Sequence, residues 1–310
     1  MMGGALRFLQ ELDGYLGRQP DGICTIGRGR RVSGRWLAER EFRALRCGHT
    51  VALNNIAFAR AGNVKTVLLR NALHFLSNEE RPLVAVGRGV RAQTAVVHRM
   101  LRRADRIVVP TTSMAARVTT IQPGVAGRIR VMHHPVSPRP ACQRRASVLL
   151  CPVLDAPYKM LGPRLAQVVQ VMEDGRGGGS LDGLELLLTL TREEAAALDL
   201  RLPSWVCLLG RLTPRELYTA QQSAQVILYP TTLESFGYPL AEARLARQPV
   251  IAPYTDHARE VADDALVGYD PSDSASLAGA IGRALELQLG PLTENPFDPD
   301  AYFDRLFSAA

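Results

Sequence analysis

Two glutamates, Glu234 and Glu242, are separated by seven intervening residues within the stretch Tyr229–Ala243. A buried strand is expected to end at Tyr229, and Pro239 is expected at the first position of a helix, where its missing N–H needs no partner. The start of a helix attracts phosphate, because its amides point outward and its dipole is positive there. The stretch therefore predicts an anion site flanked by two carboxylates.

Carboxylates do not bind phosphate, but they accept hydrogen bonds from the hydroxyls of a sugar or a ribose. Gly237 would let a ligand approach the backbone closely. The simpler interpretation of Glu234 and Glu242 is electrostatic, because acidic residues are common near helix starts. The spacing of the two glutamates alone favours the simpler interpretation. The residues around Glu234 decide between the electrostatic and the ligand-binding interpretation.

The string ESFGYP, which begins at Glu234 and is followed by Glu242, resembles the signature of retaining glycosyltransferases of family 4, which have the GT-B fold. The resemblance implies that Glu234 faces the hydroxyls of a donor sugar and Glu242 the ribose diol. The backbone from Phe236 to Tyr238 would face the diphosphate. The donor-binding residues implied by this string are Glu234, Ser235, Phe236, Gly237, Tyr238 and Glu242.

The segment 149–159 is similar to the first strand and loop of the family's donor domain, and it ends at Lys159. The resemblance implies that Lys159 neutralises charge on the departing diphosphate, which makes Lys159 and Glu234 the predicted catalytic residues. A lone lysine is otherwise a solvated surface residue. Many family members carry Gly-Arg where this chain has Cys151-Pro152, so Lys159 would have to act without that arginine.

Other parts of the chain carry weaker resemblances. Gly210, Arg211 and Leu212 resemble the turn beside the nucleotide base, although Gly210 equally suits an ordinary strand end. The segment 103–114 resembles the last strand of the N-terminal domain in polysaccharide-assembly members. The acceptor-side residues implied by comparison with the family are Gly3, Gly4, Arg70, Asn71 and His74.

The predicted site residues must be positioned by helices and strands, and the second half of the chain predicts such elements. Short β-rich runs alternate there with amphipathic helical segments such as Arg164–Met172 and Pro214–Ser223, as in a parallel sheet covered on both faces. The expected strands are Ser147–Cys151, Leu184–Leu190, Trp205–Leu209, Gln225–Tyr229, Pro249–Ala252 and Ala265–Val267. Six strands of this kind predict a Rossmann-like domain.

The first half is less regular. It predicts a helix over Leu6–Leu16 and then a series of short strands. The expected strands are Gly22–Ile26, Thr50–Leu53, Thr66–Leu69, Arg106–Val109 and Arg128–Met132. A helix over Asp300–Leu306 is expected to end the chain.

The fold class predicted from this organisation is α/β with the GT-B architecture, in which two Rossmann-like domains face a cleft. The proline-rich run from Pro135 to Pro140 breaks regular structure and marks a boundary. We expect an acceptor-side domain over residues 1–140, a nucleotide-sugar-binding domain over 141–289, and a linker and helix over 290–310 that packs on the first domain. Gly3 and Gly4 resemble a glycine loop that normally follows a first strand, so the first domain is expected to lack that strand.

Composition excludes several classes of protein. The 46% of hydrophobic and 22% of charged residues suit a folded chain, and no apolar run is long enough to span a membrane. The N-terminus lacks the apolar core of a signal peptide, so a cytoplasmic location is expected. Five widely spaced cysteines predict reduced, structural thiols, with neither a disulfide framework nor metal sites.

The formal net charge of +7 admits an anionic partner. Nucleic acid is not expected, because the basic residues are spread along the chain without interleaved aromatic residues. The richest segment, Arg81–Arg106, places Val90, Val97 and Leu101 at helical spacing. It predicts either a core-facing helix with a solvated face or a helix that rests on an anionic membrane surface.

Three other patterns predict no active site. The glycines of Gly27–Gly34 lack the spacing of a dinucleotide loop and indicate a basic turn. Asp298 and Asp300 have the spacing of a metal-binding pair, but their place before the final helix indicates capping. His133 and His134 have no third ligand nearby, so no metal site is expected.

The sequence therefore predicts a retaining, metal-independent hexosyltransferase. It would use a nucleoside diphosphate sugar and a hydroxyl acceptor, such as a glycan, a lipid-linked sugar or a natural product, and would need no cofactor. A non-catalytic GT-B partner protein is the main alternative, and a nucleotide-sugar epimerase of the same fold is a further one.

Overall fold

The computed structural model describes residues 4–18, 22–84, 86–139, 144–154, 159–179 and 181–308. By their contacts the residues divide into two units. One comprises Met1–Ala5 and Pro138–Pro296, and the other Leu6–Ser137 and Phe297–Ala310. We call them the C-terminal unit and the N-terminal unit.

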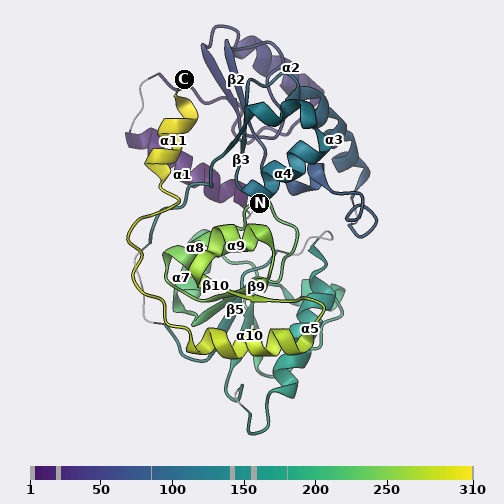
Figure 1. Ribbon diagram of the computed structural model, residues 1–310, viewed down its shortest axis with the longest axis vertical. Coiled ribbons are helices and arrows are strands. Elements are labelled where there is room, and N and C mark those ends of the chain that lie inside the picture. The colour runs from purple at the N-terminus through teal and green to yellow at the C-terminus, as the bar shows by residue number, and fades with distance from the viewer. Residues whose placement is uncertain are drawn as a thin grey trace. The chain divides into compact units, whose positions relative to one another are not determined.

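The C-terminal unit is built on a six-stranded parallel sheet of order β10-β9-β8-β5-β6-β7 (Figure 1). Its strands are β5 (Val148–Cys151), β6 (Glu185–Leu188), β7 (Val206–Leu208), β8 (Val226–Leu228), β9 (Val250–Pro253) and β10 (Leu266–Tyr269). The six predicted strands and the Rossmann-like character of this half are confirmed. The central strands are apolar throughout, because helices cover both faces of a parallel sheet.

Helices separate these strands along the chain. They are α5 (Leu161–Asp174), α6 (Arg192–Ala197), α7 (Pro214–Ser223), α8 (Tyr238–Leu245), α9 (Asp256–Ala262), the 3₁₀ turn η4 (Asp263–Ala265) and α10 (Ser274–Glu286). Helix α7 has the predicted bounds because Thr213 and Glu216 form a capping box and Pro214 opens the first turn. In Figure 1, α5 and α10 lie on one side of the sheet and α8 and α9 on the other.

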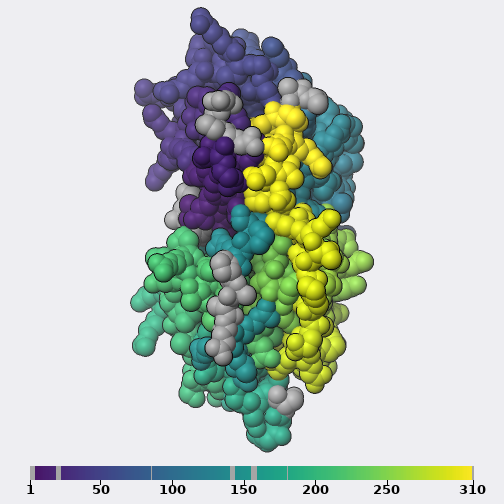
Figure 2. Space-filling view, turned by 90° about the vertical axis from the view of Figure 1, so that its left-hand side faces the viewer, coloured from purple at the N-terminus to yellow at the C-terminus, as the bar shows by residue number. Residues whose placement is uncertain are grey.

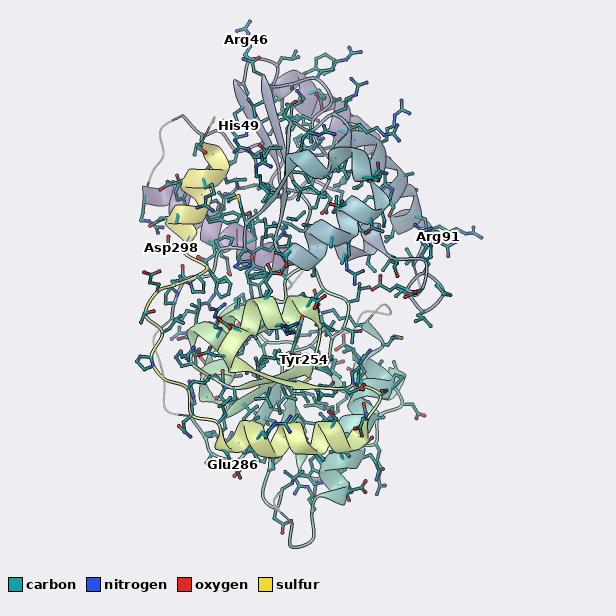
Figure 3. All side chains as sticks on the ribbon, in the orientation of Figure 1. Arg46, His49, Arg91, Tyr254, Glu286 and Asp298 are labelled. Atoms are coloured by element: carbon teal, nitrogen blue, oxygen red, sulfur yellow. The ribbon has the colours of Figure 1, made fainter. Side chains whose placement is uncertain are left out.

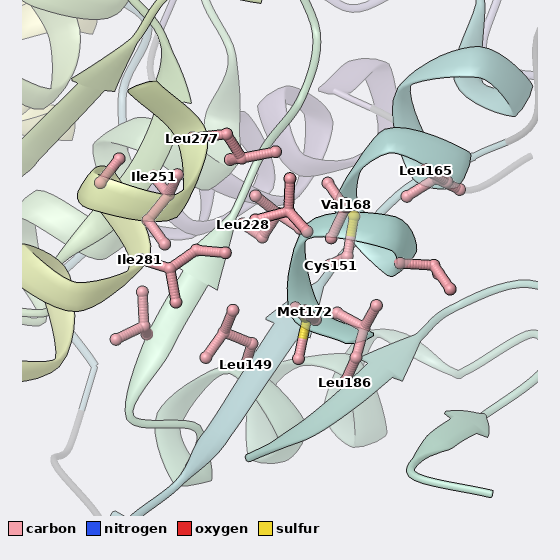
Figure 4. Packing of buried hydrophobic residues seen from close by; sticks show 14 of the residues in the cluster. Leu149, Cys151, Leu165, Val168, Met172, Leu186, Leu228, Ile251, Leu277 and Ile281 are labelled. Atoms are coloured by element: carbon pink, nitrogen blue, oxygen red, sulfur yellow. The ribbon is translucent and has the colours of Figure 1, made fainter. Parts of the chain in front are cut away.

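The core of this unit lies between the sheet and the pair α5 and α10 (Figure 4). Leu149 and Leu228 point from neighbouring strands toward Val168 of α5 and Ile281 of α10, and all four are fully buried. Burial of this extent fixes the strand ends, and therefore the loops that follow them.

The N-terminal unit contains a four-stranded parallel sheet of order β1-β2-β3-β4. Its strands are β1 (His49–Ala52), β2 (Val64–Leu68), β3 (Arg106–Val109) and β4 (Ile129–Val131). Its helices are α1 (Gly4–Arg18), α2 (Gly34–Arg43), η1 (Ala72–Phe75), α3 (Arg88–Leu101), α4 (Thr112–Ile121), η2 (Pro123–Arg128) and α11 (Pro299–Phe307).

One predicted strand of this unit is wrong. Gly22–Ile26 has no regular structure, and its residues are exposed or only half-buried. A short apolar run becomes a strand only where a neighbouring strand pairs with it, and none does so here among the described residues.

The end of the chain returns to the N-terminal unit. Helix α11 lies against α1, as Figure 2 shows for the yellow and purple segments. The Tyr15 hydroxyl donates to Asp304 Oδ1 over 2.7 Å, and the rings of Phe8 and Phe303 meet edge-to-face at 5.6 Å. Both phenylalanines are fully buried, so α11 completes the core of this unit.

Candidate functional site

The first carboxylate of the predicted signature follows strand β8. Directly after the strand comes the buried Tyr229, whose hydroxyl donates to Glu234 Oε1 over 2.7 Å. The Glu234 side chain is 19% exposed, so solvent reaches part of it. Tyr229 was expected only to end the strand, and the structure adds this hydrogen bond.

Lys159 lies opposite, after strand β5. Its Nζ is 2.9 Å from Glu234 Oε1 and 5.7 Å from the centre of the Tyr229 ring, and its side chain is 11% exposed. The preceding residues 155–158 of the predicted phosphate loop lie outside the described residues. The structure thus brings together the two residues predicted to be catalytic, although they are far apart in the chain.

The electrostatics of the pair favour its charged form. Burial by itself would raise the pKa of Glu234. The Lys159 ammonium, hydrogen bonds from Lys159 and Tyr229, and the field of His257 outweigh burial and hold that pKa below its ordinary value. Glu234 is therefore a carboxylate at neutral pH and can accept hydrogen bonds from hydroxyl groups.

Strand order explains why this pair lies where it does. The chain passes from β5 to β6 and β7 on one side, and then places β8, β9 and β10 on the other. Strands β5 and β8 are adjacent, and their connections leave in opposite directions. In open parallel sheets the crevice at the carboxyl ends of two such strands is where ligands bind. Lys159 and Glu234 both follow these carboxyl ends.

The helix after Glu234 has a start that only glycine suits. Gly237 precedes α8 with a φ of 84°, and a Cβ there would lie 2.9 Å from the side chain of Leu240. Tyr238 is the first residue of the helix and Pro239 the second, one position later than predicted. The buried ring of Phe236 packs edge-to-face on Tyr238 at 5.4 Å.

Glu242 lies on α8 and is held from α7. The Gln221 side-chain amide donates to Glu242 Oε2 over 2.9 Å, and Gln248 Nε2 donates to the backbone oxygen of Gln221 over 3.0 Å. Gln221 and Gln248 are buried. Sequence reasoning missed Gln221, because nothing near it in the chain points to Glu242.

Comparison with known protein families finds a match over part of the chain. Residues 189–296 match the model of the family described as glycosyl transferases group 1. This transferase segment contains Glu234 and Glu242, whereas Lys159 precedes it. No curated protein sequence matches the chain.

Solved structures with a similar fold cover more of the chain. WaaG, described as a glycosyltransferase involved in lipopolysaccharide biosynthesis, aligns with a TM-score of 0.64 at 14% identity, over 98% of this chain and 90% of its own. The Burkholderia xenovorans trehalose-phosphate synthase (UDP-forming), in complex with glucose-6-phosphate, aligns with a TM-score of 0.61 at 13% identity, over 89% of this chain and 78% of its own. These likenesses show the GT-B fold.

A third structure is only partly covered. A variant of S. aureus TarM, in complex with fondaparinux, α-GlcNAc-glycerol and UDP, aligns with a TM-score of 0.55 at 12% identity over 76% of this chain. The aligned part spans 45% of TarM's length.

The predicted base-side turn of the transferase segment lies after β7. Gly210 has a φ of 66°, and its N–H donates to the Leu190 oxygen over 3.1 Å. Arg211 forms an ion pair with Glu194, and Leu212 is half-buried. Glu194 also closes the capping box of α6, so Arg211 has a structural partner in this unit.

Arg70 and Asn71, two of the predicted acceptor-side residues, make contacts within the N-terminal unit. The Arg70 guanidinium lies 4.5 Å above the ring of Phe8. The Asn71 side chain caps η1 by accepting from Leu73 N over 3.0 Å. Gly4 begins α1, and Gly3 lies outside the described residues.

His74 is a buried packing residue in this structure. It is 2% exposed, and its Nδ1 lies 2.8 Å from Thr94 Oγ1. Burial, with a smaller contribution from His98, lowers its pKa to about 4. An acceptor role for Arg70, Asn71 and His74 stays a prediction.

The remaining patterns have structural explanations. Asp298 caps α11 by accepting from Ala301 N over 2.7 Å, as predicted. Gly27 accepts a turn hydrogen bond from Arg30 N over 3.1 Å, and His134 is buried. Within the described residues, no group of three or more His, Cys, Asp or Glu side chains is arranged to hold a metal ion. No helix in the described part of the chain is long and apolar enough to cross a membrane.

Proposed function

We propose that the protein is a retaining glycosyltransferase that moves a hexose from a nucleoside diphosphate sugar to a hydroxyl acceptor. One observation carries the proposal. The Lys159–Glu234 pair, 2.9 Å apart, stands at the crevice between β5 and β8, and Glu234 belongs to a group 1 glycosyl transferase segment.

Each part of the donor would meet a group of matching chemistry. The diphosphate would lie at the start of α8, where helix dipole and backbone amides favour anions. Glu234 would accept hydrogen bonds from the sugar hydroxyls, and Glu242, held by Gln221, from the ribose diol. The turn from Gly210 to Leu212 would lie beside the base.

Transfer requires cleavage of the bond between the anomeric carbon and the diphosphate oxygen. Negative charge that develops on this oxygen would be stabilised by the Lys159 ammonium and the start of α8. The new bond to the acceptor oxygen would form on the face that the diphosphate leaves, and the hydroxyl proton would depart with the diphosphate. Glu234 is engaged by Lys159 and Tyr229, which suits hydrogen bonding better than covalent attack.

Lysine and a helix terminus can supply the positive charge that diphosphate departure needs. We therefore propose that transfer is independent of metal ions, and that the nucleotide sugar is a substrate with no further cofactor. Turnover that persists in excess EDTA is the expected result. Activity that EDTA abolishes and Mg²⁺ restores would overturn metal independence.

Nucleotide binding can be tested before the acceptor is known. A thermal-shift screen would use UDP, ADP, GDP and their glucose or mannose conjugates. The ligands that carry one of the three bases should raise the melting temperature of the protein. A ligand present at 100 times its Kd stabilises the native state by about 2.7 kcal/mol. No shift with any nucleotide would contradict the donor site.

An anionic membrane is the partner that we propose for the acceptor side. Helix α3 buries Val97 and Leu101 and leaves Arg88, Arg91 and Arg99 exposed, with Arg102 and Arg103 directly after it. Figure 3 shows the Arg91 side chain extending outward. We call these five arginines the basic face. Val96 on the same helix is 38% exposed, and Leu83 before it is 67% exposed.

The basic face suits an acceptor carried on a lipid at the cytoplasmic leaflet. Each basic residue close to an anionic leaflet contributes about 1 kcal/mol of binding free energy. Exposed apolar residues such as Leu83 and Val96 can enter the headgroup region beside the arginines. The buried side of α3 shows that it is also a core-facing helix, so its charged face can be solvated, lipid-bound or both.

A further inference from the structure

Arg164 forms a second bridge between the two parts of the chain that carry Lys159 and Glu234. It lies in the first turn of α5, five residues after Lys159, and its Nη2 donates to Thr232 Oγ1 over 3.1 Å. Thr232 stands two residues before Glu234. The bridge therefore connects the helix that follows Lys159 to the loop that carries Glu234.

The Arg164 side chain also acts on a neighbouring tyrosine. Burial raises the pKa of Tyr269, at the end of β10, to about 12, and the positive charge of Arg164 opposes that rise. The planar guanidinium donates to Thr232 in a defined geometry, so it links the Thr232 side chain to α5.

Val153, two residues after β5, is held by a different side chain. The Thr189 hydroxyl, directly after β6, accepts from Val153 N over 2.9 Å and donates to the Val153 oxygen over 2.7 Å. Thr189 is buried, so this pairing is shielded from water. Thr189 thus holds the backbone at Val153, and Arg164 holds Thr232 in the loop after β8.

We propose that Arg164 is a positioning residue of the donor site, which keeps Glu234 at the distance and orientation that a sugar hydroxyl and Lys159 require. The proposal rests on the proposed glycosyltransferase function. A displacement of about 1 Å in a reacting group can cost about a hundredfold in rate. Glu242 lies on α8 and is oriented by Gln221, so Arg164 should not influence nucleotide binding.

Two independent variants test the bridge. Arg164→Gln removes the donor, and Thr232→Val removes the acceptor while keeping the side chain's shape. The exposed Arg215, in the first turn of α7, provides the matched control Arg215→Gln. Transfer of the sugar to water, followed as release of nucleoside diphosphate from UDP-glucose, ADP-glucose and GDP-mannose, gives kcat and KM, and titration with the matching diphosphate gives Kd.

Both bridge variants should lower kcat at least about tenfold and leave the Kd of the nucleoside diphosphate within about twofold. The double variant should be no slower than the slower single variant, because both substitutions break one interaction. Arg164→Lys should recover part of the rate, since an ammonium can still donate to Thr232. Arg215→Gln should match the wild type.

The outcomes separate this proposal from the proposed function. If the wild-type protein releases diphosphate from none of the three donors, the proposed function fails, and this proposal fails with it. If the wild type is active and both bridge variants keep its kcat, only the Arg164 role is overturned. It is also overturned if both variants lose nucleotide affinity and melting temperature in parallel with kcat, since that pattern marks a merely structural role.

Discussion

Lys159 neutralises the largely buried carboxylate of Glu234 in this structure, and we propose that it also stabilises the departing diphosphate. The ammonium is 2.9 Å from Glu234 and is the group that most lowers the pKa of that carboxyl. A charged pair with so little exposure is costly to break from one side, since the remaining charge loses its partner. The pair is therefore a site where function and stability are coupled.

Lys159→Ala should reduce kcat at least about tenfold, which corresponds to about 1.4 kcal/mol of transition-state stabilisation. The effect on donor KM should be smaller, because the ammonium acts mainly on charge that develops as the diphosphate departs. Steady-state kinetics measure both. Lys65→Ala is the matched control, since it removes the chain's other lysine, paired with Asp105 in the N-terminal unit. Equal kcat in both variants would contradict a catalytic role for Lys159.

Glu242→Ala should weaken the binding of nucleoside diphosphate and intact donor alike. The expected loss is about 1–3 kcal/mol, the range for a charged hydrogen-bond acceptor. Isothermal titration of UDP, ADP or GDP measures it. Glu286→Ala, at the exposed end of α10 in the same unit (Figure 3), should leave the affinity unchanged. An unaltered Kd in folded Glu242→Ala protein would remove the ribose assignment.

At the scale of elements, the loop and helix from Tyr229 to Leu245 carry the site, and Gly237 sets how the chain enters α8. Its φ of 84° is unfavourable for other residues, and a Cβ would also lie within 3.3 Å of the Tyr229 ring. Gly183 has a similar φ of 75° but open space around it. Substitution of Gly183 therefore introduces backbone strain alone, whereas substitution of Gly237 introduces backbone strain and steric crowding.

Gly183→Ala should destabilise the protein by about 1 kcal/mol, the cost of a left-handed backbone for alanine. Gly237→Ala should cost more, at least about 2 kcal/mol, because strain and crowding add. Urea unfolding of both variants gives the comparison. Equal losses would show that the Leu240 and Tyr229 side chains move aside without cost.

The sequence predicted these elements unevenly, for physical reasons. The strands of the C-terminal unit are continuous apolar runs such as Val226–Leu228, and buried parallel strands produce that pattern. Gly22–Ile26 looks similar but has no pairing strand, and pairing is not encoded locally. The Lys159 and Glu234 roles could be predicted from a motif. The Arg164–Thr232 and Gln221–Glu242 contacts could not, since they join distant segments through the fold.

At the scale of the molecule, positive charge is concentrated at one place on the surface. The net charge is +7, and the basic face of α3 concentrates five exposed arginines on one helix and the turn after it. Four other arginines of the same unit form ion pairs with carboxylates, as Arg117 does with Glu80 at 2.6 Å. Unbalanced charge of this kind attracts anionic surfaces within a Debye length, about 10 Å at 0.1 M salt.

Vesicles that contain phosphatidylglycerol should co-sediment the protein at low salt and release it at high salt. Charge reversal by Arg91→Glu and Arg99→Glu should weaken binding by at least about 2 kcal/mol, at roughly 1 kcal/mol for each basic residue removed. Reversal of the exposed Arg201 and Arg215 of the C-terminal unit is the matched control. No sedimentation at low salt would contradict the membrane contact and favour a soluble acceptor.

Retaining transfer from a nucleotide sugar is tested most directly by proton NMR of the reaction itself. The protein is incubated with α-linked UDP-glucose, ADP-glucose and GDP-mannose in turn, and the anomeric signals are followed from the first minutes. A donor site built on Lys159 and Glu234 predicts that one donor releases its nucleoside diphosphate and that the first sugar product is α-configured. Release of a β-configured product would contradict retention. Intact donors in every sample, alongside a nucleotide-dependent thermal shift, would identify a protein that binds nucleotide sugars without catalysing transfer.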